Sequence, residues 1–350
     1  MIEKEKSILV INEGSSDNLG DQAINQSLKF LVQDNLSKNY SFEDFSRNNK
    51  NKIEFALSNY GSSDNFFYFK KLIPLKILIS RIVWVRNNIG RIIRSCKNND
   101  FAIIGGGQLL LPNKKFPFQI YIWTSFFRIY GLKYSFFSVG TQGNFSNLDK
   151  FFLKNALQNA SSIYVRDALS RRIILKTFKV KSNLIYDVAF CLDKVLLTKE
   201  NIKIKNDILV GPIDFNVFKL YKSNSLNRDD YHEIWIDLMK KYDEKNIKLF
   251  YSTNDDKFEC ILFQKYIFSK TGYTLPILEN YNLSEFIENI INAKLIISGR
   301  MHSLILAKTY KIDFVPYIVS DKVSEFQNIY SDLNLETIQT KLIDKIKIIF

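Results

Sequence analysis

The sequence predicts an α/β fold of two doubly wound, Rossmann-like domains that face each other across a cleft. Short apolar runs alternate with helical patterns twice over, before and after a lysine-rich stretch at residues 194–206. Polar loops, several of them rich in glycine, follow directly on these apolar runs, as they do at the carboxyl ends of parallel strands. We therefore expect one domain at residues 1–195, a second at 196–335, and a helical tail at 336–350.

The length and composition support this organisation. The 350 residues are enough for two separate cores, and a content of 46% hydrophobic and 24% charged residues is typical of globular chains. The net charge of +13 points to an anionic partner. Because no RNA-binding aromatic signature or recognition-helix pattern is present, we expect the anion to be a small substrate or a membrane surface, and no nucleic acid.

The cysteines and the apolar runs suggest the cellular compartment. The three cysteines, Cys96, Cys191 and Cys260, are widely spaced and form neither a disulfide framework nor a CxxC metal site. No signal-peptide core precedes the first strand, and Lys or Arg interrupts each apolar run well short of the ~20 residues that a spanning helix needs. We expect a cytoplasmic protein without metal or cofactor, and peripheral association with the inner face of the membrane is left open.

The first predicted strand covers residues 7–12 and leads into a small polar loop and a helix. The loop, residues 14–21, contains two glycines and ends in Asp21. Such a loop allows a ligand to approach backbone N–H groups closely. The simpler interpretation of Asp21, at about even odds, is that it caps the following helix.

Residues 65–97 combine apolar and basic side chains in one helical pattern. Lys and Arg recur every few residues between Leu, Ile, Val and Trp84. Such a basic amphipathic helix could lie on an anionic membrane surface. The alternative, favoured about two to one, is a helix that packs on the sheet with solvated cations.

Three further strands complete the first half. Residues 100–107 run into three glycines, as suits a backbone that passes close to a ligand. Residues 136–144 end in another glycine-bearing loop, and residues 162–172 read as strand followed by helix. That pattern places Arg166 at the end of a strand, with Asp167 as the helix cap. Residues 185–190 close this half.

A second series of strands is expected at residues 207–211, 248–251 and 273–278, followed by a helix at 283–292. His232 stands in a polar lead into a helix, and we interpret it as a surface or capping residue.

The stretch 293–317 organises the rest of the chain. A strand at 295–297 ends in Ser298 and Gly299, and Arg300, Met301 and His302 then open a helix that leads to a strand at 314–319. The loop therefore offers a fixed cation, a titratable imidazole and the free N–H groups of a helix start. These are the groups needed to hold an anion and to move a proton.

Taken in order, the motifs NLGDQAI, IIGGGQLL, SVGTQG, YVRDALS, YDVAF and SGRMHSLILA resemble the polysaccharide pyruvyl transferase family, from about Ile8 to Lys322. The resemblance implies a fold like that of the two-domain GT-B glycosyltransferases. It also implies transfer of the enolpyruvyl carbons of phosphoenolpyruvate onto two sugar hydroxyls, giving a cyclic pyruvate ketal on a capsule, exopolysaccharide or cell-wall polymer or its precursor.

The resemblance also assigns roles to residues. His302 matches the catalytic histidine, and Arg166 and Arg300 match the donor-binding arginines, with Arg300 also in the catalytic group. Met301, which stands where leucine is common in the family, is expected to be a substrate-binding residue. The remaining matches are Asp21 as a catalytic residue and Asn18, Gly106, Gly107 and Lys322 as substrate-binding residues.

Other interpretations remain open. His302 could merely cap its helix, and Arg166 could form an ion pair between domains. A nucleotide-sugar glycosyltransferase on the same fold would bind nucleotide and ignore phosphoenolpyruvate. An inactive family member could instead serve as a binding subunit in polysaccharide assembly. The sugar acceptor could be lipid-linked or nucleotide-linked.

Overall fold

A computed structural model describes residues 7–36, 39–46, 66–113, 115–196, 206–221, 226–318, 321–330 and 333–349. Within these ranges the side chains of 66–75, 244, 321, 322, 325, 328 and 329 are not described. Most of the expected linker, residues 197–205, lies outside the described residues.

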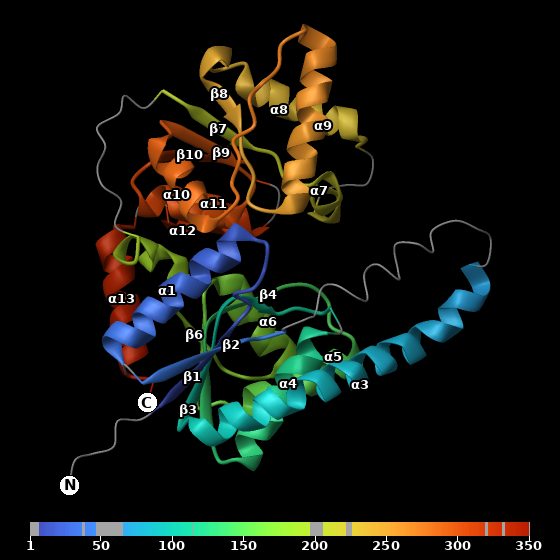
Figure 1. The fold of residues 1–350 in the computed structure, drawn as a ribbon, viewed down its shortest axis with the longest axis vertical. Coiled ribbons are helices and arrows are strands. Elements are labelled where there is room, and N and C mark those ends of the chain that lie inside the picture. Colours follow the sequence, from blue (N-terminus) through green and yellow to red (C-terminus); the bar gives the residue numbers. More distant parts are fainter. Residues whose placement is uncertain are drawn as a thin grey trace. The chain divides into compact units, whose positions relative to one another are not determined.

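Two sheets confirm the α/β class, and every pairing for which a register is given is parallel (Figure 1). The first sheet has the order β2-β1-β3-β4-β5-β6 and the second β10-β9-β7-β8. The first comprises β1 (Ile8–Asn12), β2 (Tyr40–Asp44), β3 (Phe101–Leu110), β4 (Lys133–Thr141), β5 (Ser162–Val165) and β6 (Asn183–Leu184). The second comprises β7 (Ile208–Gly211), β8 (Ile247–Leu249), β9 (Leu295–Ser298) and β10 (Asp313–Pro316).

Helices connect the strands and cover the sheets, and polar residues cap many of their first turns. Asn18, Ser146 and Asn282, for example, each accept a backbone N–H from the helix that they precede. The α-helices are α1 (Leu19–Asn35), α3 (Phe66–Asn98), α4 (Phe116–Ile129), α5 (Asn147–Gln158), α6 (Ala168–Phe178), α7 (Phe215–Tyr221), α8 (Arg228–Met239), α9 (Asn254–Thr271), α10 (Leu283–Asn292), α11 (Met301–Thr309), α12 (Asp321–Tyr330) and α13 (Leu335–Lys347). Two 3-10 helices, η1 (Val188–Lys194) and η2 (Glu244–Asn246), complete the described elements.

The chain forms two compact units that interleave along the sequence. The first comprises Met1–Ser15, Asn39–Tyr164 and Ser170–Asn183, and the second comprises Ser16–Lys38, Val165–Leu169 and Leu184–Phe350. Helix α1 and the segment after β5 therefore belong to the second unit. The boundaries predicted at residues 195 and 335 stay a prediction. The expected helical tail is present as α13, which packs on α1 and η1.

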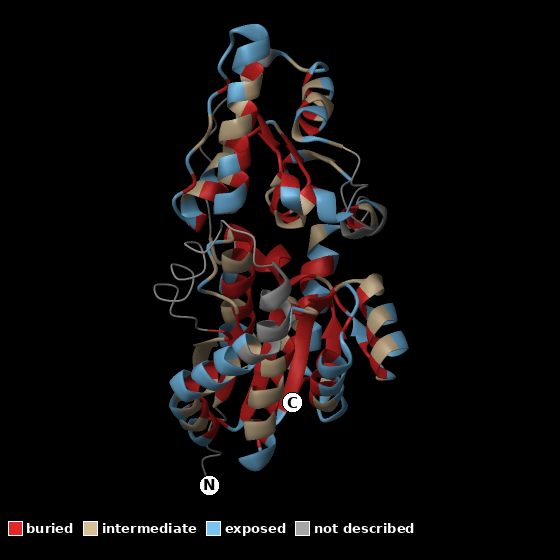
Figure 2. Cartoon of the chain, turned by 90° about the vertical axis from the view of Figure 1, so that its right-hand side faces the viewer, coloured by how far each residue is buried: buried red, intermediate tan, exposed pale blue. Residues whose placement is uncertain are grey.

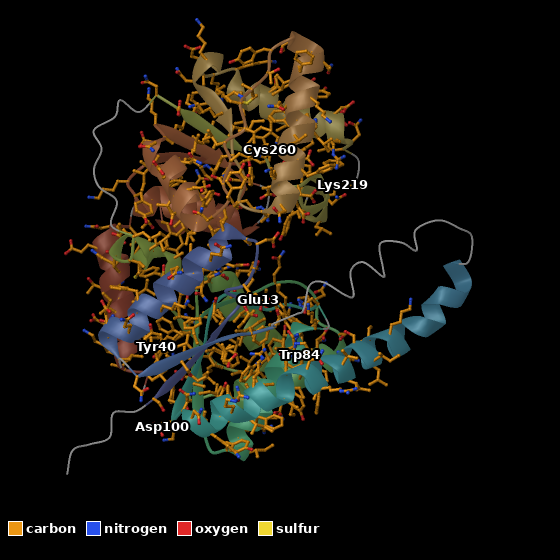
Figure 3. All side chains as sticks on the ribbon, in the orientation of Figure 1. Glu13, Tyr40, Trp84, Asp100, Lys219 and Cys260 are labelled. Carbon is orange, nitrogen blue, oxygen red and sulfur yellow. The ribbon has the colours of Figure 1, made fainter. Side chains whose placement is uncertain are left out.

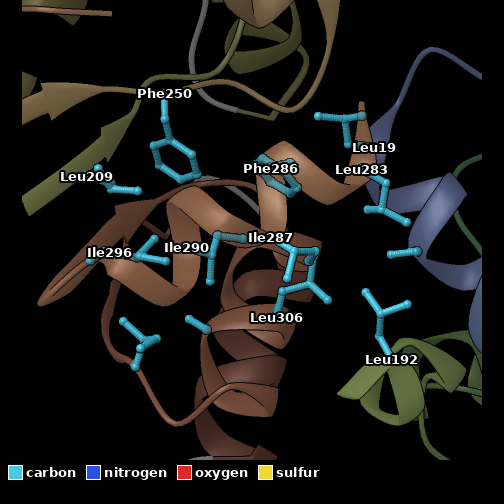
Figure 4. Close-up of a cluster of buried hydrophobic side chains, with 14 residues drawn as sticks. Leu19, Leu192, Leu209, Phe250, Leu283, Phe286, Ile287, Ile290, Ile296 and Leu306 are labelled. Atoms are coloured by element: carbon cyan, nitrogen blue, oxygen red, sulfur yellow. The ribbon is translucent and has the colours of Figure 1, made fainter. Parts of the chain in front are cut away.

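The core of the second unit joins the sheet to helices from distant parts of the chain. Helix α10 turns Phe286, Ile287 and Ile290 inward against Ile296 of β9 and Leu306 of α11 (Figure 4). The same cluster includes Leu19 and Ala23 of α1 and Leu192 of η1. Burial of this apolar surface fixes the start of α1 against α10 and η1. Buried residues follow the strands, and exposed residues follow the outer sides of the helices (Figure 2).

Most expected strands are present, and two predictions were wrong in detail. Residues 273–278 form only an isolated bridge between Ile277 and Leu249. Strand β3 does not stop at its glycines but continues to Leu110. Gly106 and Gly107 adopt φ values of 69° and 78°, and the register with β4 shifts after them. Only glycine accepts such φ values without strain, so the bulge needs these residues.

The three cysteines lie in the interior of the structure. Cys96, Cys191 and Cys260 are free and buried (Figure 3 labels Cys260). Burial raises the pKa of the Cys96 and Cys191 thiols to about 12. Among the described residues, no helix meets the length and apolarity needed to cross a bilayer.

His232 is not the surface or capping residue that the sequence suggested. The capping box at the start of α8 is formed by Asn227 and Asp230 instead. His232 is 2% exposed, and its Nε2 lies 2.8 Å from Oε1 of Glu259, which is fully buried. Glu259 also accepts the backbone N–H of Phe215 at 3.1 Å. This pair is a structural link between α8, α9 and the start of α7.

We expect Glu259→Ala to cost about 3–5 kcal/mol of unfolding free energy, because it leaves buried polar partners unpaired. Asp237→Ala is the matched control: it also removes a carboxylate from a salt bridge, with Lys240, but both side chains are over 60% exposed. We expect that change to cost less than about 1 kcal/mol. Urea unfolding of both variants measures the difference, and equal losses of stability would contradict the structural role of Glu259.

Candidate active site

The loop after β9 has the predicted form of strand, tight loop and helix. The strand ends at Ser298, whose Oγ accepts the backbone N–H of Arg300 at 3.1 Å. Arg300 has extended φ and ψ and is the N-cap of α11, so Met301 and His302 begin the helix. His302 therefore stands in a first turn, where unpaired N–H groups and the helix dipole favour an anion.

Arg166 lies directly after β5 and is almost completely buried, at 4% exposure. Its Nη1 donates a hydrogen bond to Oδ2 of Asp187 at 2.6 Å, and its Nε lies 3.8 Å from Oδ2 of Asp167. The hydroxyl of Tyr330 donates to the backbone carbonyl of Arg166 at 3.3 Å. The guanidinium is thus fixed by groups within the second unit.

Asp187 is the counter-ion of this arginine. It is 2% exposed and is the N-cap of η1, where its Oδ1 accepts the N–H of Ala189 at 2.9 Å. Burial alone would raise the pKa of its carboxyl. Arg166, His302 and the Ala189 N–H outweigh burial and hold that pKa well below the usual range.

His302 stands against this ion pair. Its Nε2 lies 3.3 Å from Nη1 of Arg166 and 3.6 Å from Oδ2 of Asp187. Nε2 thus faces a donor, the guanidinium of Arg166, and an acceptor, the carboxylate of Asp187, and which of the two it bonds depends on the tautomer of the ring. The side chain is 14% exposed and therefore remains accessible to a substrate.

The backbone of α1 covers the other side of the imidazole. Asn18 caps α1 by accepting the N–H of Gly20 at 2.9 Å, and the N–H of Leu19 donates to the carbonyl of Ser252 at 2.9 Å. A Cβ atom on Gly20 would lie 2.7 Å from both Cβ and Cγ of His302, closer than real atoms approach. Glycine is therefore needed here for close approach to a side chain of the same unit.

Asp21, in the first turn of α1, interacts electrostatically with His302, Arg166 and Asp187. Burial raises the pKa of its carboxyl, and Asp187 adds to this, while His302, Ser16 and Arg166 lower it; the net shift is upward. The site thus holds two carboxyl groups with opposite pKa shifts, Asp187 downward and Asp21 upward.

The guanidinium of Arg300 is paired with Asp256. Nε and Nη2 of Arg300 donate to the two carboxylate oxygens at 2.9 and 2.6 Å, a bidentate geometry. Asp256 also accepts the N–H of Asp214 at 3.0 Å. Burial lowers the pKa of Arg300, but Asp256 more than compensates, so the net shift is upward.

The structure therefore brings Asp21, Arg166 and His302 together, as the sequence suggested. Met301 opens α11 beside His302, and Asn18 acts as a helix cap. Gly106 and Gly107 lie in β3, in the first unit. The side chain of Lys322 lies outside the described residues. Among the residues that the structure describes, no group of His, Cys, Asp and Glu could hold a metal ion.

Sequence reasoning assigned no role to Asp187 or Asp256. Asp187 belongs to the quoted YDVAF motif, where a carboxylate before three buried apolar residues signals a buried partner. Asp256 resembled one more acidic residue in the first turn of α9. The sequence alone does not show that Asp256 is buried while its neighbour Asp255 is exposed.

Comparisons with known proteins bear on the fold and on the family of the chain. Among solved structures, the chain is similar to UDP-GlcNAc 2-epimerase from Methanocaldococcus jannaschii, with 14% identity, 98% of this chain and 92% of that chain covered, and a TM-score of 0.51. It is also similar to UDP-N-acetylglucosamine 2-epimerase from Rickettsia bellii, with 10% identity, 99% and 96% coverage, and a TM-score of 0.50. At these identities the likeness shows the fold alone, and it confirms the expected GT-B-like class.

No curated protein matches the chain in sequence. A family model described as polysaccharide pyruvyl transferase matches residues 18–321. That match begins at the Asn18 cap, includes the segments that carry Asp21, Arg166, Asp187, Arg300 and His302, and confirms the resemblance seen in the sequence motifs. The chain therefore belongs to the polysaccharide pyruvyl transferase family.

Proposed function

We propose that this chain transfers the enolpyruvyl carbons of phosphoenolpyruvate onto two hydroxyls of a sugar, forming a cyclic pyruvate ketal on a cell-surface polysaccharide or its precursor. The observation that carries the proposal is the contact between Nε2 of His302 and Nη1 of Arg166. In this contact a titratable imidazole lies beside a buried cation, in the first turn of a helix. Membership of the family supports the reaction class.

The donor has charges that suit this site. Phosphoenolpyruvate carries a carboxylate and a phosphate, and a guanidinium and a helix N-terminus both favour anions. Arg166 and the first turn of α11 supply these two features. Asp256 engages Nε and Nη2 of Arg300, so we expect Arg300 to meet the donor through Nη1.

Ketal formation requires one proton to be added to the methylene carbon of phosphoenolpyruvate and one proton to be removed from each of the two sugar hydroxyls. Protonation of the methylene carbon makes the central carbon electrophilic, and one sugar hydroxyl then adds to it. Loss of phosphate and attack by the second hydroxyl complete the ketal. One hydroxyl proton restores the acid, and the other leaves with the phosphate. A bound dianionic donor favours protonation of His302, so the substrate itself would prepare the imidazole as an acid.

The two carboxyl groups have different roles in this scheme. Asp187, whose pKa is held low, stays ionised and keeps Arg166 and His302 in place. Asp21, whose pKa is raised, is the carboxyl that can exchange a proton with the reacting groups. Paired groups with opposed pKa shifts commonly divide the work in this way.

Incubation with phosphoenolpyruvate and a panel of β-galactosyl, N-acetylmannosaminyl and glucosyl acceptors tests the proposal. We expect phosphate release together with an acceptor mass gain of one ketal-linked pyruvate. His302→Gln should lower turnover by about 10²–10⁴-fold while calorimetry still detects donor binding.

Nucleotide-sugar turnover without phosphate release would favour the glycosyltransferase alternative. No turnover of either donor would favour the binding-subunit alternative. Full activity of His302→Gln would exclude the histidine from the chemistry.

Gly20→Ala tests the packing of α1 against His302. The added methyl group must displace the imidazole, and a shift of about 1 Å can cost about 100-fold in rate. Gly90→Ala is the matched control, because a Cβ on Gly90 meets nothing within 4 Å. We expect the control to keep its turnover on a water-soluble acceptor and to gain up to about 1 kcal/mol of stability. Equal turnover of the two variants would show that Gly20 does not position the histidine.

Asp21→Asn should separate stability from activity. A carboxyl whose folded-state pKa is raised contributes most to stability at low pH, and this contribution is lost as pH rises through the folded-state pKa. The neutral amide should therefore raise Tm at pH 7 relative to the parent protein. This gain should disappear near pH 3.8 and below, the ordinary range of the Asp pKa. Turnover should fall at the same time. A lower Tm at pH 7 would contradict this account of Asp21.

A further inference from the structure

The positive charge of the chain is concentrated in one segment of the first unit. Residues 66–148 contain twelve Lys and Arg but a single acidic residue, Asp100. This segment thus supplies +11 of the net charge of +13. It includes α3 and α4 and reaches the start of α5. Such an asymmetry in the sequence favours this segment as the one that would meet an anionic partner.

One face of α3 packs inside the first unit. Trp84 is 7% exposed, and its Nε1 donates to the carbonyl of Ser46 at 2.6 Å (Figure 3 labels Trp84). Arg81 lies over the rings of Phe118 and Phe152 at 5.0 and 5.3 Å. Within the described part of α3, packing on α4, α5 and the segment after β2 therefore accounts for this face.

The opposite face of the same helix is apolar and exposed. Leu78, Ile79, Ile82 and Val83 have exposed fractions of 53%, 51%, 59% and 37%. Their spacing places them on one stripe of the helix. Lys76 and Arg86 are exposed at the two ends of this stripe. The packing of α3 on α4 and α5 does not account for this second face.

Helix α5 continues the pattern. Leu148 and Phe151 are 48% and 57% exposed, and Lys150 and Lys154 are exposed beside them. The acidic residue of α5, Asp149, is buried. The ring of Phe151 lies 5.7 Å from that of Phe152, which in turn lies under Arg81 of α3. We define the apolar–basic surface as these exposed residues of both helices: Leu78, Ile79, Ile82, Val83, Leu148 and Phe151, with Lys76, Arg86, Lys150 and Lys154.

We propose that the apolar–basic surface docks the enzyme onto an anionic lipid bilayer, with its Leu, Ile, Val and Phe side chains in the headgroup region and its cations against lipid phosphates. Exposed aliphatic side chains contribute nothing to binding a polyanion such as RNA, where phosphate contacts dominate. They partition into a bilayer interface, where apolar burial and attraction to anionic lipid act together. The proposal is independent of the reaction, because none of these residues belongs to the candidate active site.

Sedimentation of the full chain with vesicles tests the proposal. We expect binding to phosphatidylcholine vesicles that contain about a third phosphatidylglycerol, and much weaker binding to pure phosphatidylcholine. Each cation near such a surface contributes about fivefold in affinity at low salt. Arg86→Gln with Lys150→Gln should therefore weaken binding by about 25-fold. Equal sedimentation with both vesicle types would overturn the proposal.

The decisive variant leaves the charge unchanged. Leu78→Gln with Ile82→Gln should weaken vesicle binding by at least about tenfold, because two exposed aliphatic side chains no longer enter the interface. Leu220→Gln with Ile348→Gln is the matched control, since these side chains are 81% and 60% exposed in the second unit. If both double variants bind alike while Arg86→Gln with Lys150→Gln binds weakly, the surface recognises a polyanion and the membrane assignment is wrong.

The vesicle assay tests the docking surface, and the activity assay tests the proposed reaction, so each proposal can be contradicted without the other. Circular dichroism establishes that each variant folds, and ketal formation on a water-soluble acceptor should be unchanged in Leu78→Gln with Ile82→Gln. An inactive but vesicle-binding protein would contradict the proposed reaction alone. An active protein that ignores anionic vesicles would contradict the docking surface alone.

Discussion

The candidate site depends on the buried ion pair between Arg166 and Asp187. Both side chains are at most 4% exposed, and losing either would leave an unpaired buried charge, which costs about 3–5 kcal/mol. The pair fixes the direction of Nη1 of Arg166, and that N–H faces Nε2 of His302. The orientation of the imidazole follows, with its other side against Gly20. A preorganised cation beside the imidazole is thus a consequence of one pair.

A second carboxylate fixes the loop from which His302 projects. Asp256 accepts the N–H of Asp214 after β7, lies 3.4 Å from the hydroxyl of Ser252 after β8, and binds the guanidinium of Arg300 after β9. The carboxyl ends of three neighbouring parallel strands are therefore linked through one side chain. Because Arg300 is the N-cap of α11, this link also sets where the helix begins. Arg300 accordingly has a positioning role in the structure, in addition to the donor-binding role that we propose.

The sequence predicted those features that depend on residues close together in the chain, and missed those that depend on contacts between distant segments. Helix α10 has a strong apolar stripe and clear caps, and its predicted bounds, 283–292, match the structure. The segment 273–278 is also apolar, yet it pairs with the neighbouring strand β8 through a single bridge. A single sequence does not show which strand, if any, such a segment will pair with. Asp21, Arg166 and His302 were found through motifs. Asp187 and the buried pair of His232 with Glu259 were missed because they depend on contacts between segments 21 or more residues apart.

The central proposal is that Nε2 of His302 accepts a hydrogen bond from Arg166 in the empty protein and takes up a proton when an anionic donor arrives. The chain has only two histidines, so ¹⁵N-histidine NMR resolves them, and His302→Gln assigns the signals. Without donor, we expect His302 to show the Nδ1–H tautomer with a bare Nε2. Addition of phosphoenolpyruvate should shift both nitrogens toward the values of an imidazolium. An Nε2–H tautomer in the empty protein, or signals that do not respond to the donor, would contradict the account.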